Sequence, residues 1–219
     1  MTLVAISAAY GAGGSSIGPA VAQRLGVPFV DRAIPRGVAA RLNVSFDEAA
    51  AYDEPTGRRW LDRMLSGFLG VDTGAPAPLP AETVTSEDFR RATEEVLVRQ
   101  AATGQGVILG RGAVVVLRDD PRALRVRLYG PPERRVEQAM RIQGVDRETA
   151  ERARRRLDQT HSTYLREFYG ADIDDPSLYH LTLDSTAIDS EACVELIARA
   201  ARAVRTAESG PSGTPPERA

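Results

Sequence analysis

A run of glycines and hydroxyl side chains near the start of the chain has the spacing of a phosphate-binding loop. It occupies residues 11–18 and follows an apolar stretch at residues 2–7. A helical pattern begins at about residue 15, so the loop would open onto a helix N-terminus. Backbone N–H groups and the helix dipole favour anions at such a place. The order of these segments therefore predicts a strand, a phosphate-binding loop and a helix.

The loop lacks the lysine of an ordinary P-loop. All 28 basic side chains of this protein are arginine, and the chain contains no lysine. In the pattern G-x-x-x-x-G-K-[ST], the lysine reaches the β- and γ-phosphates of the nucleotide. The sequence thus indicates a nucleotide-binding scaffold in which one standard catalytic part is missing.

Two other interpretations of the same loop stay open. The G-x-G-x-x-G pattern of dinucleotide-binding proteins is present at Gly11 and Gly13 but fails at Ser16. Asp31 nevertheless follows at about the 20-residue spacing where a ribose-binding acid would lie. A tight turn without a ligand is the second alternative, although four glycines in residues 11–18 cost backbone entropy that a bare turn would not require.

Arginines supply further candidate contacts to phosphate. Arg111 follows a predicted strand and stands between Gly110 and Gly112, and its planar fork suits bidentate phosphate contact. Many more arginines lie in residues 133–170, where two helices joined at Gly144 are predicted. A closing lid of arginines would neutralise a transferring phosphoryl group and exclude water, although solvated faces paired with glutamates account for most of them. This combination favours a small-molecule kinase over a dehydrogenase.

The elements that would position these residues alternate between strand and helix. Helical patterns cover residues 15–25 and 190–204, and each is placed beside apolar strand segments. The predicted strands are residues 2–7, 28–30, 107–109, 125–129 and 181–183. This alternation predicts an α/β fold with a parallel doubly wound sheet and ligands at the carboxyl ends of its strands.

Length and composition fit one globular domain. With 219 residues, 42% of them hydrophobic, the chain can bury a sizeable core. We expect a single domain over residues 1–206, with a helical insert at about 41–82 and a lid at about 133–170. The tail at 207–219 has almost nothing apolar to bury, so we expect it to be disordered.

Charge, cysteine content and hydropathy exclude several classes. The net charge of −2 argues against a general nucleic-acid binder. The single cysteine, Cys193, excludes an internal disulfide framework and fits a reducing cytoplasm. No apolar run approaches the roughly 20 residues of a membrane span, and Met1 leads directly into a strand pattern. We therefore expect a cytoplasmic protein whose partner is a small-molecule nucleotide, without nucleic-acid or membrane partners.

Four segments together resemble the cytidylate kinase-like family, relatives of the P-loop nucleoside monophosphate kinases. They are residues 6–18, 25–31, 107–113 and 169–179. The resemblance implies a P-loop NTPase-type parallel sheet flanked by helices, with a helical acceptor-side insert and an arginine-rich helical lid. It also implies phosphoryl transfer from ATP, with Mg²⁺, to a nucleoside monophosphate such as CMP or dCMP, or to a similar small phosphate.

The resemblance assigns ligand contacts by position. Arg111 matches an arginine that holds the acceptor's phosphate, and Asp31 would lie beside the acceptor pocket. The hydroxyl of Ser16 matches a ligand of Mg²⁺. The residues that would cradle the ATP phosphates are Gly11, Ala12, Gly13, Gly14, Ser15 and Ser16.

The expected catalytic residues lie on the second lid helix. Asp158 matches the aspartate of the family's D-x-x-R lid motif. Arg154 and Arg155 precede it by one turn, and we expect them to supply the charge of the missing lysine on closure.

The chain also departs from the family pattern. Gly14 stands where true cytidylate kinases have the loop lysine, Gly112 replaces the aspartate of a G-R-D motif, and His161 replaces the lid arginine. His161 would contact a phosphate when protonated, or else would border the apolar stripe of its helix. These departures keep open a non-catalytic nucleotide-binding regulatory module derived from a kinase. A dinucleotide-dependent oxidoreductase is a third interpretation.

Overall fold

The structure is a computed structural model that describes residues 2–30 and 86–204. Asp31, the expected insert at 41–82 and the expected tail at 207–219 lie outside the described residues.

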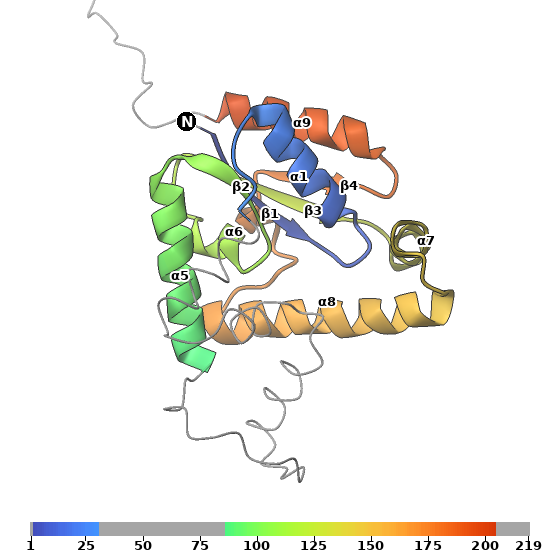
Figure 1. The fold of residues 1–219 in the computed structure, drawn as a ribbon. Coiled ribbons are helices and arrows are strands. Elements are labelled where there is room, and N and C mark those ends of the chain that lie inside the picture. Colours follow the sequence, from blue (N-terminus) through green and yellow to red (C-terminus); the bar gives the residue numbers. More distant parts are fainter. Residues whose placement is uncertain (1, 31–85, 205–219) are drawn as a thin grey trace, which may run out of the picture.

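The centre of the fold is a parallel four-stranded sheet in the order β2-β1-β3-β4 (Figure 1). The expected strands at 107–109, 125–129 and 181–183 are confirmed, and each extends further at one end than the pattern indicates. At 28–30 the structure has a single parallel bridge, from Phe29 to Val107, because Pro28 has no N–H to extend the ladder. The strands are β1 (Thr2–Ala8), β2 (Gln105–Leu109), β3 (Ala123–Tyr129) and β4 (Leu181–Asp184).

Helices cover both faces of the sheet (Figure 1). One face packs against α1 (Gly14–Leu25) and α9 (Ser190–Ala203). The other packs against three helices: α5 (Ser86–Ala102), α6 (Ala113–Val116) and α8 (Arg147–Tyr169). Between β3 and α8 lies α7 (Pro132–Gln143), and a short 3₁₀ turn (Pro176–Leu178) precedes β4. This is the α/β architecture that the sequence predicts.

Burial of β1 on both faces fixes the base of the loop that follows it. Residues 3–6 are all fully buried, since β1 lies between β2 and β3. Val4 and Ile6 pack towards α1 and α9, whereas Leu3 and Ala5 pack towards α5 and α6. A continuous apolar run is typical of a strand covered by helices on both sides.

The two helices expected in residues 133–170 are confirmed, with the break where the sequence indicates it. Gly144 ends α7 in the left-handed region, at φ +67°. Asp146 begins α8 by accepting a hydrogen bond of 2.8 Å from the backbone N–H of Thr149. These local signals determine where the pair bends, because a glycine tolerates positive φ and an aspartate satisfies an N-terminal donor.

Candidate active site

The loop between β1 and α1 leaves backbone donors free at the start of a helix. Gly13 caps α1 with φ +72°, a conformation that residues with a Cβ rarely adopt. Within the part of the chain that the structure describes, the N–H groups of Gly13, Gly14 and Ser15 donate to no other residue. Unsatisfied N–H groups at a helix N-terminus attract anions. The loop can therefore bind phosphate through its backbone.

Several loop glycines are also required by packing against the protein itself. A Cβ on Gly14 would lie 2.6 Å from the Cβ of Ala8, and one on Gly18 would lie 2.9 Å from the ring of Phe29. A Cβ on Gly11 would overlap the backbone carbonyl of Arg135. The number of glycines is therefore not by itself a sign of a ligand. The free backbone N–H groups are the stronger indication that the loop binds an anion.

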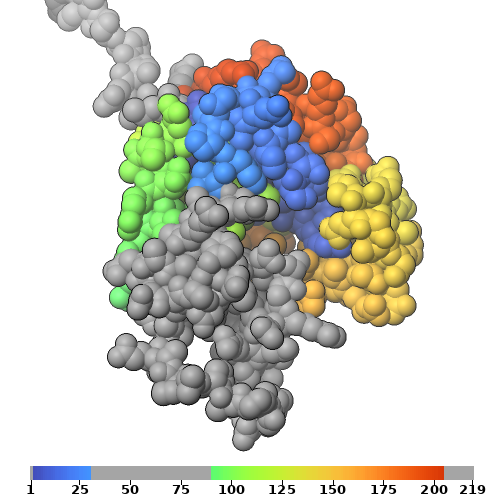
Figure 2. Space-filling model, in the orientation of Figure 1, coloured from blue at the N-terminus to red at the C-terminus, as the bar shows by residue number. Residues whose placement is uncertain are grey.

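A hollow of about 570 Å³ lies beside the free donors. Its volume falls within the roughly 300–1,000 Å³ of small-molecule sites. In the space-filling view, α7 (yellow) lies against the loop and the start of α1 (blue), and α9 (red) lies above (Figure 2). The lining comes from the start of α1, from α7 and from the β4–α9 turn: Gly13, Ser16, Ile17, Gln138, Arg141, Ile142 and residues 185–190.

Hydrogen bonds hold the turn after β4 against the loop. The buried hydroxyl of Ser185 donates to the carbonyl of Ala12 at 2.7 Å. Asp184 accepts from the hydroxyl and the N–H of Thr186 at 2.6 and 3.0 Å, and these bonds hold the pKa of Asp184 below its usual value. Arg134 on α7 lies 3.5 Å from the same carboxylate. The β4–α9 turn is thus linked both to the β1–α1 loop and to α7.

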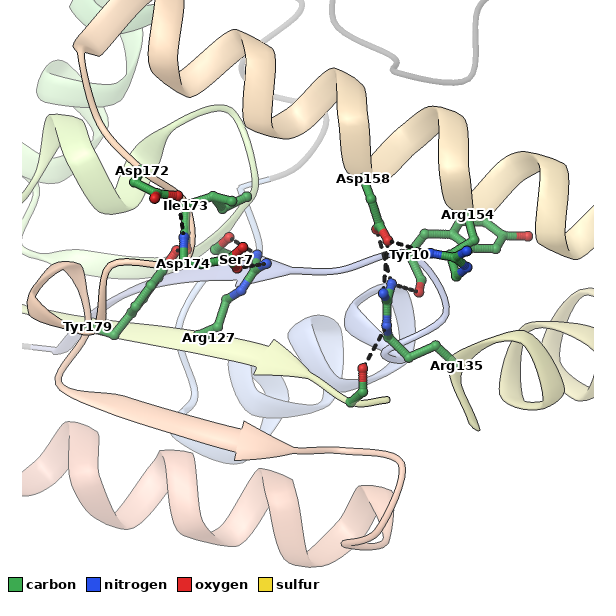
Figure 3. A network of polar contacts seen from close by, with 11 residues as sticks. Ser7, Tyr10, Arg127, Arg135, Arg154, Asp158, Asp172, Ile173, Asp174 and Tyr179 are labelled. Carbon is green, nitrogen blue, oxygen red and sulfur yellow. Dashed lines mark hydrogen bonds and ion pairs between the residues drawn. The ribbon is translucent and has the colours of Figure 1, made fainter. Parts of the chain in front are cut away.

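Arg135 joins the loop to α7 and α8 (Figure 3). Its buried guanidinium donates to the carbonyl of Tyr10 at 2.9 Å and to that of Gly130 at 2.9 Å. It also donates twice to the carboxylate of Asp158 on α8, at 3.0 and 2.8 Å. In the sequence, Arg135 is one of many arginines in residues 133–170, and residue type and spacing do not distinguish it from the exposed ones.

The three residues expected to be catalytic are only partly brought together. Asp158 is the carboxylate partner of Arg135, and Arg154 lies 3.5 Å from it (Figure 3). Arg155 is 61% exposed and lies 3.8 Å from Glu151. None of the three lines the hollow. Their catalytic roles stay predictions, and the contacts of Asp158 are those of a positioning residue.

Arg111 stands on a strained turn at the carboxyl end of β2. Its φ is +57°, and it is the one residue other than glycine with positive φ in the described ranges. Its neighbours Gly110 and Gly112 share this conformation, at +73° and +68°. Backbone strain of this kind concentrates at functional sites. A Cβ on Gly112 would lie 3.0 Å from the ring of Tyr169, so any larger residue after Arg111 would crowd this ring.

A buried arginine on β3 was not anticipated from the sequence. Arg127 is 9% exposed, donates to the hydroxyl of Ser7 at 2.8 Å and lies 3.5 Å from Asp174 (Figure 3). Burial and this guanidinium lower the pKa of His161, while Asp158 acts in the opposite direction. These surroundings favour the neutral form of His161 over the charged form that a phosphate contact would require.

The described part of the chain could supply only a few protein ligands to a metal ion. No group of three or more His, Cys, Asp or Glu side chains there could hold a metal ion. Mg²⁺ bound to a nucleotide needs only one or two protein ligands, because phosphates and waters complete its shell. The exposed Ser16 hydroxyl in the wall of the hollow fits that requirement.

In residues 2–30 and 86–204, no helix is long and apolar enough to cross a membrane.

Comparison with known proteins gives a family match and similar solved structures. The model of the cytidylate kinase-like family matches residues 3–187. A solved structure, of an uncharacterized protein from Eubacterium ventriosum ATCC 27560, is similar with a TM-score of 0.65. It is 18% identical in sequence, and the match covers 92% of this chain and 98% of that chain. At that identity the likeness shows the fold alone.

Two kinases resemble the chain more distantly. Shikimate kinase from Acinetobacter baumannii in complex with shikimate is 17% identical, with 93% of both chains covered and a TM-score of 0.45. A gluconokinase from Sinorhizobium meliloti 1021 is 16% identical, with 92% of this chain and 94% of that chain covered and a TM-score of 0.46. Neither likeness bears on the site. A search of curated protein sequences finds no significant match.

Proposed function

The chain belongs to the cytidylate kinase-like family, and on that premise we propose that it transfers a phosphoryl group from ATP to a small phosphate acceptor. A nucleoside monophosphate of the CMP or dCMP type is the acceptor we propose first. The observation that carries the proposal is the hollow of about 570 Å³ next to the free N–H groups of Gly13, Gly14 and Ser15. A donor nucleotide in this hollow would place its phosphates at the start of α1, where the dipole is favourable.

The residues divide between donor and acceptor sides. The loop at residues 11–16 binds the donor's phosphates, and the Ser16 hydroxyl holds Mg²⁺, which would supply charge neutralisation there. Arg111 binds the acceptor's phosphate from the carboxyl end of β2. Catalysis then consists of positioning and charge stabilisation, since phosphoryl transfer needs little covalent help from the protein.

A regulatory module that binds nucleotide without turnover is the second candidate. The family resemblance aligns Gly14 with the loop lysine, and the Cβ of Ala8 closes the space beside Gly14. The loss of such an electrostatic part costs roughly 10³-fold or more in rate when nothing replaces it. The two candidates share the donor site and differ in turnover.

Binding and turnover are measured separately to test the proposal. Isothermal titration calorimetry with ATP, CMP, dCMP, AMP and NADH, each with and without Mg²⁺, measures which ligands bind. ADP release from ATP in the presence of each monophosphate then measures transfer. We expect Mg²⁺-dependent binding of ATP and ADP release with at least one monophosphate.

Each of the other outcomes supports a different interpretation. ATP binding without any transfer replaces the kinase by the regulatory module. Binding of NADH but not ATP favours the oxidoreductase interpretation. If no nucleotide binds at millimolar concentration, the loop is a structural turn and the proposal is wrong.

A further inference from the structure

The loop cannot carry its own cation at the usual place. Gly14 is buried, and a Cβ there would lie 2.6 Å from the Cβ of Ala8 and 3.2 Å from Leu109 Cδ1. The methyl of Ala8 is attached directly to the backbone of β1, so it cannot rotate away. A lysine at residue 14 would therefore displace the strand or the helix. Any cation that meets the donor's phosphates must come from another element.

The element that faces the loop across the hollow is α7. The side-chain amide of Gln138 lies 3.1 Å from where a Cβ on Gly13 would be. Arg141 follows Gln138 by three residues, so the two side chains lie on the same face of the helix. Both line the hollow together with Gly13 and Ser16. The face of α7 that meets the loop thus carries an amide and a guanidinium.

Arg141 differs from most other arginines of α7 and α8 in its charge partners. It makes no ion pair or hydrogen bond with any residue in the ranges 2–30 and 86–204. Six other arginines of the two helices lie within 4 Å of a carboxylate: Arg134, Arg135, Arg147, Arg152, Arg154 and Arg155. A phosphate that met one of those six would compete with an existing carboxylate. A phosphate that met Arg141 would not.

Two arginines tie the first turn of α7 to its neighbours. Arg135 donates to the carbonyl of Tyr10, and Arg134 lies 3.5 Å from the carboxylate of Asp184 at the end of β4. The helix that carries Arg141 is thus anchored on the loop side. This preorganisation lowers the entropic cost of forming a contact to phosphate.

We propose that Arg141, beside Gln138 on α7, supplies the cationic contact to the donor's β- and γ-phosphates that the missing loop lysine would make. This inference rests on the proposed function, since it concerns the donor of the same site. It assigns the donor-side charge to α7, whereas the sequence pattern predicts it from Arg154 and Arg155 on α8.

The test compares nucleotides that differ only in phosphate number. Calorimetric titration of Arg141→Gln with AMP, ADP and ATP, with Mg²⁺, measures how the loss grows with each phosphate. We expect AMP affinity to change less than about two-fold and ATP affinity to fall about ten- to hundred-fold, the range of a charge-assisted contact. The salt dependence of ATP binding should also become weaker, because one cation has been removed from the site.

Arg152→Gln is the matched control. Arg152 is 62% exposed and pairs with Glu148 within α8, outside the hollow. We expect this variant to bind all three nucleotides like the wild-type protein. Thermal melting of both variants should match the wild type, since neither side chain is buried.

Three results would overturn the inference. Unchanged ATP affinity in Arg141→Gln excludes the contact. An equal loss for AMP, ADP and ATP assigns Arg141 to the base or to the pocket wall instead of the phosphates. If the Arg154→Gln/Arg155→Gln variant loses ATP affinity and Arg141→Gln does not, the cationic contact to the donor's phosphates comes from α8 instead of α7. If the wild-type protein binds none of the three nucleotides, the proposed function fails first, and this inference fails with it.

Discussion

The guanidinium of Arg135 on α7 and the carboxylate of Asp158 on α8 form two parallel hydrogen bonds of 3.0 and 2.8 Å. The guanidinium is buried and also donates to the carbonyls of Tyr10 and Gly130. Through this one side chain, the β1–α1 loop, the end of β3, α7 and α8 are connected. A residue identified from the sequence as catalytic, Asp158, thus holds the geometry of the site.

Asp158→Asn should therefore destabilise the fold. The amide keeps the shape but removes the charge that partners the buried Arg135, so we expect a loss of about 1.5–3 kcal/mol in the free energy of unfolding. Urea denaturation measures it. Arg152→Ala, which removes an exposed ion pair on α8, should cost less than about 0.5 kcal/mol. Equal, small effects of the two variants would mean that the pair of Arg135 and Asp158 contributes little to the free energy of unfolding.

Ala8 and Gly14 should be energetically coupled. Gly14→Ala places a Cβ about one ångström too close to that of Ala8 and should cost about 1–3 kcal/mol through overpacking. Ala8→Gly removes the obstructing methyl, so the double variant should be more stable than the sum of the single effects by about 1 kcal/mol or more. Additive effects in this double-mutant cycle would show that the space beside Gly14 is not closed by Ala8.

Gly13→Ala and Gly26→Ala separate backbone strain from ligand contact. Both glycines have positive φ, +72° and +67°, so each alanine should destabilise the fold by about 1–2 kcal/mol. A Cβ on Gly13 points towards Gln138 across the hollow, whereas one on Gly26 meets nothing within 4 Å. We expect ATP affinity to fall about ten-fold or more in Gly13→Ala alone. A similar fall in Gly26→Ala would attribute the effect to strain.

Arg111→Gly should separate function from stability at the acceptor side. Glycine relieves about 1 kcal/mol of backbone strain at φ +57°. It also gives the unfolded chain more conformational freedom, which makes folding less favourable by a similar amount. The free energy of unfolding should therefore change by less than about 0.5 kcal/mol. Binding of the acceptor monophosphate should weaken by about 1.5–3 kcal/mol, and ATP binding should stay the same. Calorimetry and urea denaturation measure the two effects. A large loss of stability would assign Arg111 a structural role.

His161 should titrate below the ordinary histidine pKa of about 6.5, because burial and the Arg127 guanidinium disfavour its charged form. His180 should do so as well, through burial and Arg125. ¹H–¹⁵N NMR titration measures both, and His180→Gln assigns the two signals.

The lowered pKa values of the two histidines make the stability of the fold depend on pH. The unfolded chain takes up a proton at these histidines more readily than the folded protein does. Stability is therefore complete above about pH 6.5 and falls as the pH decreases towards the lowered folded pKa. His161→Gln should reduce this loss. A His161 that titrates at or above 6.5 contradicts the prediction.

The sequence by itself determined the local elements and their ends. The glycine cap at Gly144 and the aspartate cap at Asp146 act through neighbours within a few residues. Such signals depend on hydrogen bonds and backbone conformations that are local in the chain, so pattern and residue type suffice to predict them. The order of strand, loop and helix at the phosphate loop belongs to this class.

Only the tertiary structure decided which side chains meet at the site. Arg135 and Asp158 are 23 residues apart, and Ser185 and Ala12 are 173 residues apart. Which arginine of a rich helical pair is buried, which is paired with a carboxylate and which faces the hollow depends on how α7 packs against the loop. That packing places Arg141 beside the loop and Arg155 in solvent, although the two residues are of the same type on adjacent helices. Residue type and spacing cannot distinguish them, because the distinction arises from contacts between segments that are distant in the chain.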